Sequence, residues 1–134
     1  MTDELQITLE VIVVPVSDVD RSKEFYEDRL GFHVDHDTTV DEATRIVQLT
    51  PPGSGCSIVI AKGIPQMEPG TLDGVQLVVS DIDEARSLFT SRGVEASEVV
   101  VRGPAEMDGS KFISFPDPDG NMWAVQELRA RVET

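Results

Sequence analysis

The sequence predicts an α+β fold built from two tandem units, each with the order strand, helix and three strands (βαβββ). The first observation is an internal repeat: "VVPVSDVDRSKEFYEDRLGF", from Val13 to Phe32, is matched by "LVVSDIDEARSLFTSRGV", from Leu77 to Val94. The second is a set of candidate strands after each copy. The 134 residues are of the size of one compact domain, 1–134.

The first unit begins with a run of β-branched residues, "VVPV", which favours a buried strand. Asp18 and Asp20 can accept hydrogen bonds from the free N–H groups at a helix start. Gly31 suits the left-handed position after a helix, so the helix is expected to end there. The sequence then predicts strands at roughly 31–37, 43–50 and 56–62.

The second unit repeats this pattern. Asp81 and Glu84 have the spacing of a capping box, and Gly93 marks the expected end of the helix. One buried helix face is predicted from the apolar residues Ile82, Ala85, Leu88 and Phe89. Strands are expected at roughly 94–101, 110–116 and 121–128.

Two stretches rich in Pro and Gly divide these elements. "GIPQMEPGT" at 63–71 is predicted to link a first module at 5–62 to a second at 72–129. "DPDGN" at 117–121 has the residues of a tight hairpin turn.

The composition limits the classes of function. A net charge of −14 argues against nucleic-acid binding and favours a soluble surface, or a site that attracts cationic ligands. Cys56 is the single cysteine, so no disulfide can form within the chain. The first residues lack the pattern of a signal peptide, and the longest apolar run, "VIVVPV", is too short to span a membrane. We expect a cytoplasmic protein with no membrane contact.

The motifs "SDVDRSKEFYEDRLGF" and "FPDPDGNMWAVQE", on a duplicated βαβββ unit, resemble the vicinal oxygen chelate superfamily, which includes glyoxalases, bleomycin-resistance proteins and extradiol dioxygenases. The resemblance covers nearly the whole chain. It implies two curved, mixed sheets around a cleft, as in the glyoxalase-like fold, and a homodimer. It does not specify the reaction, because this fold carries many chemistries.

The resemblance also implies where a divalent metal would bind in metal-dependent members. The matching positions are Val11, Gln48, Gly74 and Ala124. Three of these residues have no side-chain donor, and a catalytic divalent site needs about three protein ligands. We therefore expect no metal and no cofactor. His33 and His36 stand three apart on a candidate strand, so we expect them on opposite sheet faces and poorly placed as joint ligands.

Strand alternation extends the predicted cleft beyond these positions. The predicted ligand-binding residues are Val11, Val13, Gln48, Gln76, Met122, Ala124 and Gln126. Trp123 and Val125 should face the other way and pack under a helix, and Arg45 should point away from Gln48. The glutamines could bind a ligand, or they could instead satisfy each other, bind water or lie in a dimer interface.

Three hypotheses of function remain open. The first is a metal-free protein that binds or sequesters a small organic molecule, similar to the bleomycin-resistance branch, with a cationic ligand favoured by the charge. The alternative is a metal-dependent glyoxalase- or dioxygenase-type enzyme whose ligands lie outside the matched positions. The third is a scaffold or regulatory dimer. Neither a general-base pair nor a nucleophile triad is apparent, so no catalytic residue is predicted.

Overall fold

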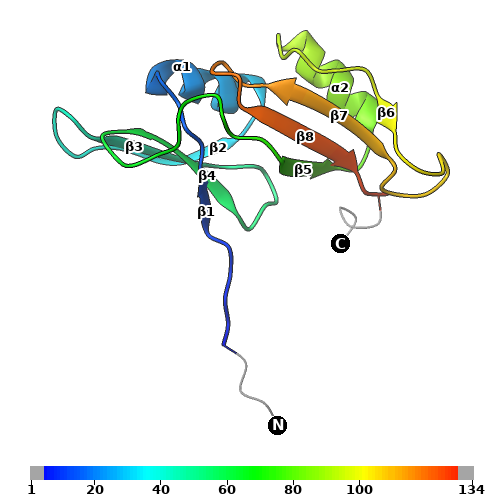
Figure 1. Cartoon of the computed structure of the whole chain (residues 1–134), viewed down its shortest axis with the longest axis horizontal. Coiled ribbons are helices and arrows are strands. Elements are labelled where there is room, and N and C mark those ends of the chain that lie inside the picture. The colour runs from blue at the N-terminus through cyan, green and yellow to red at the C-terminus, as the bar shows by residue number, and fades with distance from the viewer. Residues whose placement is uncertain (1–4, 130–134) are drawn as a thin grey trace.

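A computed structural model describes residues 5–129 of the chain (Figure 1). The elements in chain order are β1 (Val11–Val13), α1 (Val19–Glu24), the π-helical turn η1 (Phe25–Arg29), β2 (His33–Thr39), β3 (Arg45–Thr50), β4 (Ser57–Lys62), β5 (Val75–Val79), α2 (Ile82–Ser91), β6 (Val100–Val101), β7 (Lys111–Pro116) and β8 (Met122–Glu127). None of the helices in this part of the chain is long and apolar enough to cross a membrane. The predicted α+β fold with two βαβββ modules is confirmed.

The strands form two four-stranded mixed sheets with equivalent topology. The orders are β1-β4-β3-β2 and β5-β8-β7-β6. The outer pairs β1–β4 and β5–β8 are parallel, and the other pairs are antiparallel. In Figure 1 the sheets lie beside each other and both helices cover the same side. We call the two sheet faces that carry no helix the open faces.

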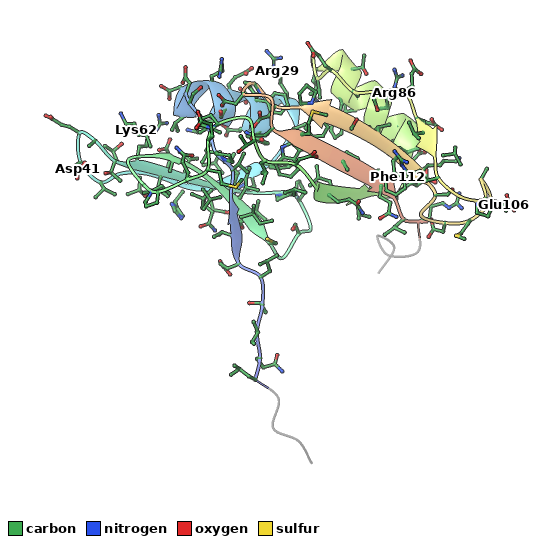
Figure 2. The ribbon with its side chains drawn as sticks, viewed as in Figure 1. Arg29, Asp41, Lys62, Arg86, Glu106 and Phe112 are labelled. Atoms are coloured by element: carbon green, nitrogen blue, oxygen red, sulfur yellow. The ribbon has the colours of Figure 1, made fainter. Side chains whose placement is uncertain are left out.

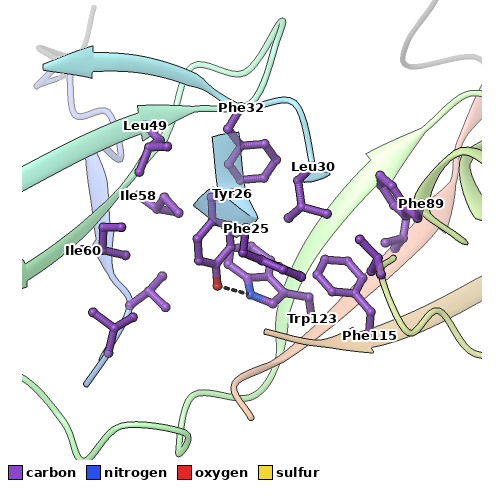
Figure 3. Close-up of a cluster of buried hydrophobic side chains, with 14 of the residues drawn as sticks. Phe25, Tyr26, Leu30, Phe32, Leu49, Ile58, Ile60, Phe89, Phe115 and Trp123 are labelled. Carbon is purple, nitrogen blue, oxygen red and sulfur yellow. Dashed lines mark hydrogen bonds between the residues drawn. The ribbon is translucent and has the colours of Figure 1, made fainter. Parts of the chain in front are cut away.

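The helix-covered faces form the core because apolar side chains alternate along each strand. Val47 and Leu49 of β3 are fully buried, as is Val125 of β8. Figure 3 shows how the aromatic residues of the two modules meet, with Tyr26 and Trp123 at the centre. One continuous core therefore joins both modules, and Trp123 and Val125 pack under the helices as predicted.

The helix ends have the chemistry that the repeat predicts. The Asp18 carboxylate accepts from the Arg21 N–H at 3.1 Å, and that of Asp81 accepts from Glu84 at 3.0 Å. The glycines after the two helices have φ of 81° (Gly31) and 82° (Gly93), a conformation that a residue with a Cβ rarely adopts.

The strand predicted at 94–101 is largely wrong, because only Val100–Val101 is a strand. Ser97 explains the difference. Its backbone N–H donates to the Ser114 carbonyl at 2.8 Å, but its side-chain oxygen, not its carbonyl, accepts from the Ser114 N–H at 2.9 Å. A hydroxyl thus replaces a backbone carbonyl beside β7, and the segment before β6 is irregular.

Polar side chains also connect the modules. The Tyr26 hydroxyl donates to Asp117 at 2.7 Å and accepts from the Trp123 indole N–H at 2.9 Å. The Asn121 amide donates to the Pro15 carbonyl at 2.9 Å. The "DPDGN" turn does join β7 to β8 as predicted, and its side chains also bind the first module.

Candidate functional site

The residues predicted to bind a ligand lie on the open faces. On β8, Met122, Ala124 and Gln126 are half-buried, whereas Trp123 and Val125 between them are buried. Gln76 of β5 lies directly beside Ala124. The open face of the second sheet therefore presents a largely apolar surface with amide groups, as strand alternation predicts.

The first sheet supplies the other predicted residues. Val11 and Val13 lie on β1, and Val13 is 36% exposed. Val59 of β4 pairs with Val13 on one side and with Gln48 of β3 on the other. These side chains therefore form a row across the open face of the first sheet, with Gln48 as its amide.

The glutamines have different hydrogen-bond partners. Gln76 donates through Nε2 to the Gln126 Oε1 at 2.8 Å, and Gln126 donates to the Gly109 carbonyl at 2.9 Å. For this pair, the alternative that the glutamines satisfy each other is supported. The half-buried Gln48 side chain has no hydrogen bond to any residue in 5–129. Gln48 is therefore the amide that remains available to a ligand.

The prediction that the two histidines lie on opposite sheet faces is wrong. His33 pairs with Thr50, and His36 pairs with Gln48, with a bulge between them. Because paired residues of antiparallel strands share a face, and Thr50 and Gln48 are two apart, both histidines lie on the open face. The extra residue of the bulge reverses the alternation that the spacing alone implies.

The same bulge creates a polar chain that the sequence analysis did not identify. Thr50 donates its hydroxyl proton to the Asp35 carboxylate. Since that hydroxyl has only one proton, the buried Ser57 must donate to the Thr50 oxygen, at 2.6 Å. His33 Nε2 lies 4.0 Å from Asp35 Oδ1. Ser57, Thr50 and Asp35 thus place hydroxyl and carboxylate groups beside Gln48 on the open face.

The four positions that would hold a metal do not fit one chemically. Gly74 precedes β5 and has no side chain, and Val11 and Ala124 are aliphatic. Gln48 alone offers an oxygen. Elsewhere in residues 5–129, no three His, Cys, Asp or Glu side chains are grouped so that they could hold a metal ion.

Other charged groups have structural partners away from the open faces. Arg45 forms ion pairs with Asp37 at 2.8 Å and with Asp20, before β2, at 2.6 Å. Hydrogen bonds from Arg45 and then Lys23 hold the pKa of the Asp37 carboxyl well below its ordinary value. Glu127 is buried on the helix side, where it accepts from the Ile82 N–H at 2.9 Å.

A cavity of about 360 Å³ is lined by residues of both modules, among them Ile12 of β1, Ile58 of β4 and Val75 of β5. It is lined by Gln76 and Gly74 but not by Gln48 or Gln126. The predicted residues thus form two neighbouring surfaces of one chain and do not meet in this cavity.

Comparisons with known proteins agree with this geometry. The chain is similar, with a TM-score of 0.78 and 28% identity, to TnmS3, described as an antibiotic binding protein from Streptomyces sp. CB03234; the match covers 94% of this chain and 99% of that one. A glyoxalase/bleomycin resistance protein from the same organism has 30% identity and a TM-score of 0.74, over 90% of this chain and 100% of that one.

A curated relative is the uncharacterized protein YetH of Bacillus subtilis (strain 168), which is 25% identical over 87% of this chain and 94% of its own length. The family model described as Glyoxalase/Bleomycin resistance protein/Dioxygenase superfamily matches residues 8–125. With the duplicated βαβββ fold, this match shows that the chain belongs to the Glyoxalase/Bleomycin resistance protein/Dioxygenase superfamily.

Proposed function

We propose that the protein binds a small organic molecule on its open faces without using a metal. The observation that carries the proposal is the half-buried amide of Gln48, which has no partner within residues 5–129 and lies beside Val59 on the open face of the first sheet. A few oriented polar groups on an apolar surface are typical of small-molecule sites. The similarity to an antibiotic binding protein supports the same function.

The proposed contacts fall into two kinds. Apolar area comes from Val11, Val13, Met122 and Ala124. Hydrogen bonds come from Gln48, which can both donate and accept, and from the Gln76–Gln126 pair if a ligand replaces their mutual bond. The net charge of −14 favours a cationic ligand by raising its concentration near the surface.

The test is a thermal-shift screen of planar and cationic antibiotics, followed by calorimetry on the compounds that stabilise the protein. The expected result is binding with one-to-one stoichiometry per chain in the presence of a chelator. Gln48→Leu should weaken binding by about ten-fold, because one hydrogen bond is lost. Ala124→Trp should abolish it by filling the face, whereas Ala43→Trp, in an exposed turn, should not change it.

Two results would contradict the proposal. One is that the protein binds Ni²⁺, Zn²⁺, Mn²⁺ or Fe²⁺ stoichiometrically and that every organic ligand binds only when this metal is present. That result would favour the metal-dependent alternative. The other is unchanged affinity in both Gln48→Leu and Ala124→Trp, which would place the ligand elsewhere.

A further inference from the structure

The cavity of about 360 Å³ that both modules line has mainly apolar walls, which include Ile12, Ile58 and Leu77. No charged side chain of residues 5–129 lines it. The lining residues with a polar group in the side chain are Ser54, Cys56, Ser57, Gln76 and Trp123. A volume of this size, with few polar groups on apolar walls, is typical of a site for a small organic molecule.

The side-chain donors that the first module brings to the cavity are all used within the protein. The Ser54 hydroxyl donates to the Cys56 carbonyl at 2.8 Å, and the Cys56 thiol donates to the Ser57 carbonyl at 3.6 Å. Ser57 donates its hydroxyl proton to Thr50 at 2.6 Å, because Thr50 gives its own proton to Asp35. The Ser57 oxygen accepts from no group within residues 5–129, so it remains available as an acceptor.

The second module uses its donors in the same way. Trp123 donates its indole N–H to Tyr26 at 2.9 Å. The Gln126 amide nitrogen donates to the Gly109 carbonyl at 2.9 Å, so the Gln126 oxygen has to accept from Gln76, at 2.8 Å. These two bonds fix the orientation of the Gln76 amide. One of its two N–H groups is used, and its oxygen has no partner within residues 5–129.

The polar side chains of the cavity therefore offer an excess of acceptors. Ser57 and Gln76 each present a free oxygen, whereas Gln76 alone keeps a free side-chain N–H. The backbone leaves this balance unchanged, since each residue on the free edge of β5 carries one N–H and one C=O. Ser57 is only 7% exposed and Gln76 is exposed, so the two acceptors lie at different depths.

The charges around the cavity favour a cation. The chain carries a net charge of −14, and Glu10 and Asp73 are each next in sequence to a lining residue. Figure 2 shows Arg29 and Arg86 among the helices, on the other side of the sheets from the segment that precedes β1. A cation near the cavity therefore meets a negative potential.

We propose that this cavity binds a protonated primary amine carried on an apolar body, with Ser57 and Gln76 accepting its N–H groups. An ammonium group has three donors and no acceptor, which matches the excess of acceptors in the cavity. A ligand carbonyl would instead meet the Ser57 oxygen, whose proton is already used, and would lose its hydrogen bond to water. Ser57 is thus a specificity-determining residue that selects donors over acceptors.

The test is a titration of isotope-labelled protein with two probes of the same ring system, naphthylmethylamine and methyl naphthyl ketone, followed by NMR. The amine is expected to bind at least about ten-fold more tightly than the ketone. It should shift the signals of the Trp123 indole and the Gln76 side chain. The preference should persist in about 0.5 M NaCl, which screens the net charge but not a hydrogen bond inside the cavity.

Two variants separate the hydrogen bonds from packing. Ser57→Ala removes the inner acceptor and should weaken amine binding by about ten-fold, with ketone binding unchanged. Thr50→Val removes the group that takes the Ser57 proton, so Ser57 can donate to the ketone. This variant should bind the ketone about five-fold more tightly than the wild type, and the amine less tightly. The matched control, Thr38→Val at an exposed position of β2, should change neither affinity.

Circular dichroism checks that the Ser57 and Thr50 variants fold. If either does not fold, Gln76→Leu still tests the site, because Gln76 is exposed. This variant removes the outer acceptor, and it should weaken amine binding by about five-fold without changing ketone binding.

Four outcomes would overturn the proposal. No measurable binding of the amine, or equal affinity for both probes, would show that the free oxygens do not select a ligand. A preference that disappears in salt would reduce the effect to net charge. Equal weakening of both probes by Ser57→Ala would make Ser57 a structural residue. The proposed function has its own variants at Gln48 and Ala124, which do not line this cavity, so either proposal can fail without the other.

Discussion

The two helices begin in the same way in sequence but are held by different partners. At the first, the Ser17 backbone and hydroxyl donate to Asp119 of the other module, at 3.1 and 2.5 Å. At the second, Ile82 donates to Glu127 of its own sheet at 2.9 Å. Lys62 ends β4 as Glu127 ends β8, so the first module lacks the equivalent carboxylate. The repeat encodes each unit, and the residues that differ between copies determine how the units join.

The buried aromatic residues show the same contrast. Tyr26 of the first copy matches Phe89 of the second in the repeat. Phe89 only packs, with its ring centroid 5.7 Å from that of Phe115, whereas Tyr26 also donates to Asp117. One hydroxyl therefore converts a packing position into a link between modules.

The strongest way to test this link is Asp117→Ala. The Asp117 carboxylate accepts from the Tyr26 hydroxyl, the Asn121 side chain and two backbone N–H groups of its turn. Its loss leaves several buried donors unpaired, and we expect the free energy of unfolding to fall by about 3–5 kcal/mol. Urea denaturation measures this, with the exposed Asp73→Ala as the control. A loss below about 1 kcal/mol would show that the turn is not the joint between modules.

Alkaline titration tests the same link through Tyr26, the single tyrosine. Burial, and then the nearby Asp117 charge, raise the pKa of its hydroxyl far above the ordinary value. Because the pKa of the Tyr26 hydroxyl is raised in the folded protein, the neutral hydroxyl stabilises the fold. This stabilisation is complete below about pH 10 and is lost as the pH rises above that value. Tyrosinate absorbance should therefore appear only as the protein unfolds. Trp123 fluorescence measures the unfolding independently. Ionisation near pH 10 in folded protein would contradict the buried hydrogen bond.

Features that each module forms by itself could be predicted from the sequence. The helix caps at Asp18 and Asp81 and the turns at Gly31 and Gly93 depend on neighbours a few residues away, and they are confirmed. The buried face of Trp123 follows from alternation within one strand. These features need no knowledge of how the modules meet.

Other features depend on contacts distant in sequence. The bulge in β2 is visible only once His33 and His36 are paired with β3, and no residue pattern around Asp35 indicates it. The hydrogen bond between the Ser97 hydroxyl and the Ser114 N–H, which shortens β6, also joins residues distant in sequence and could not be predicted. For the site, the residues of the open faces could be predicted, but the pairing of Gln76 with Gln126 required the geometry of two strands.

The smallest expected effect compares the strand ends directly. Glu127→Ala should lower the free energy of unfolding by about 2 kcal/mol, because a buried carboxylate bonded to the start of α2 is lost. Lys62→Ala, at the equivalent and exposed position, should change it by less than about 0.5 kcal/mol. Urea denaturation of both variants measures the difference. Equal effects would mean that the Glu127 hydrogen bond to α2 adds little stability. The two helices would then not differ in the way described above.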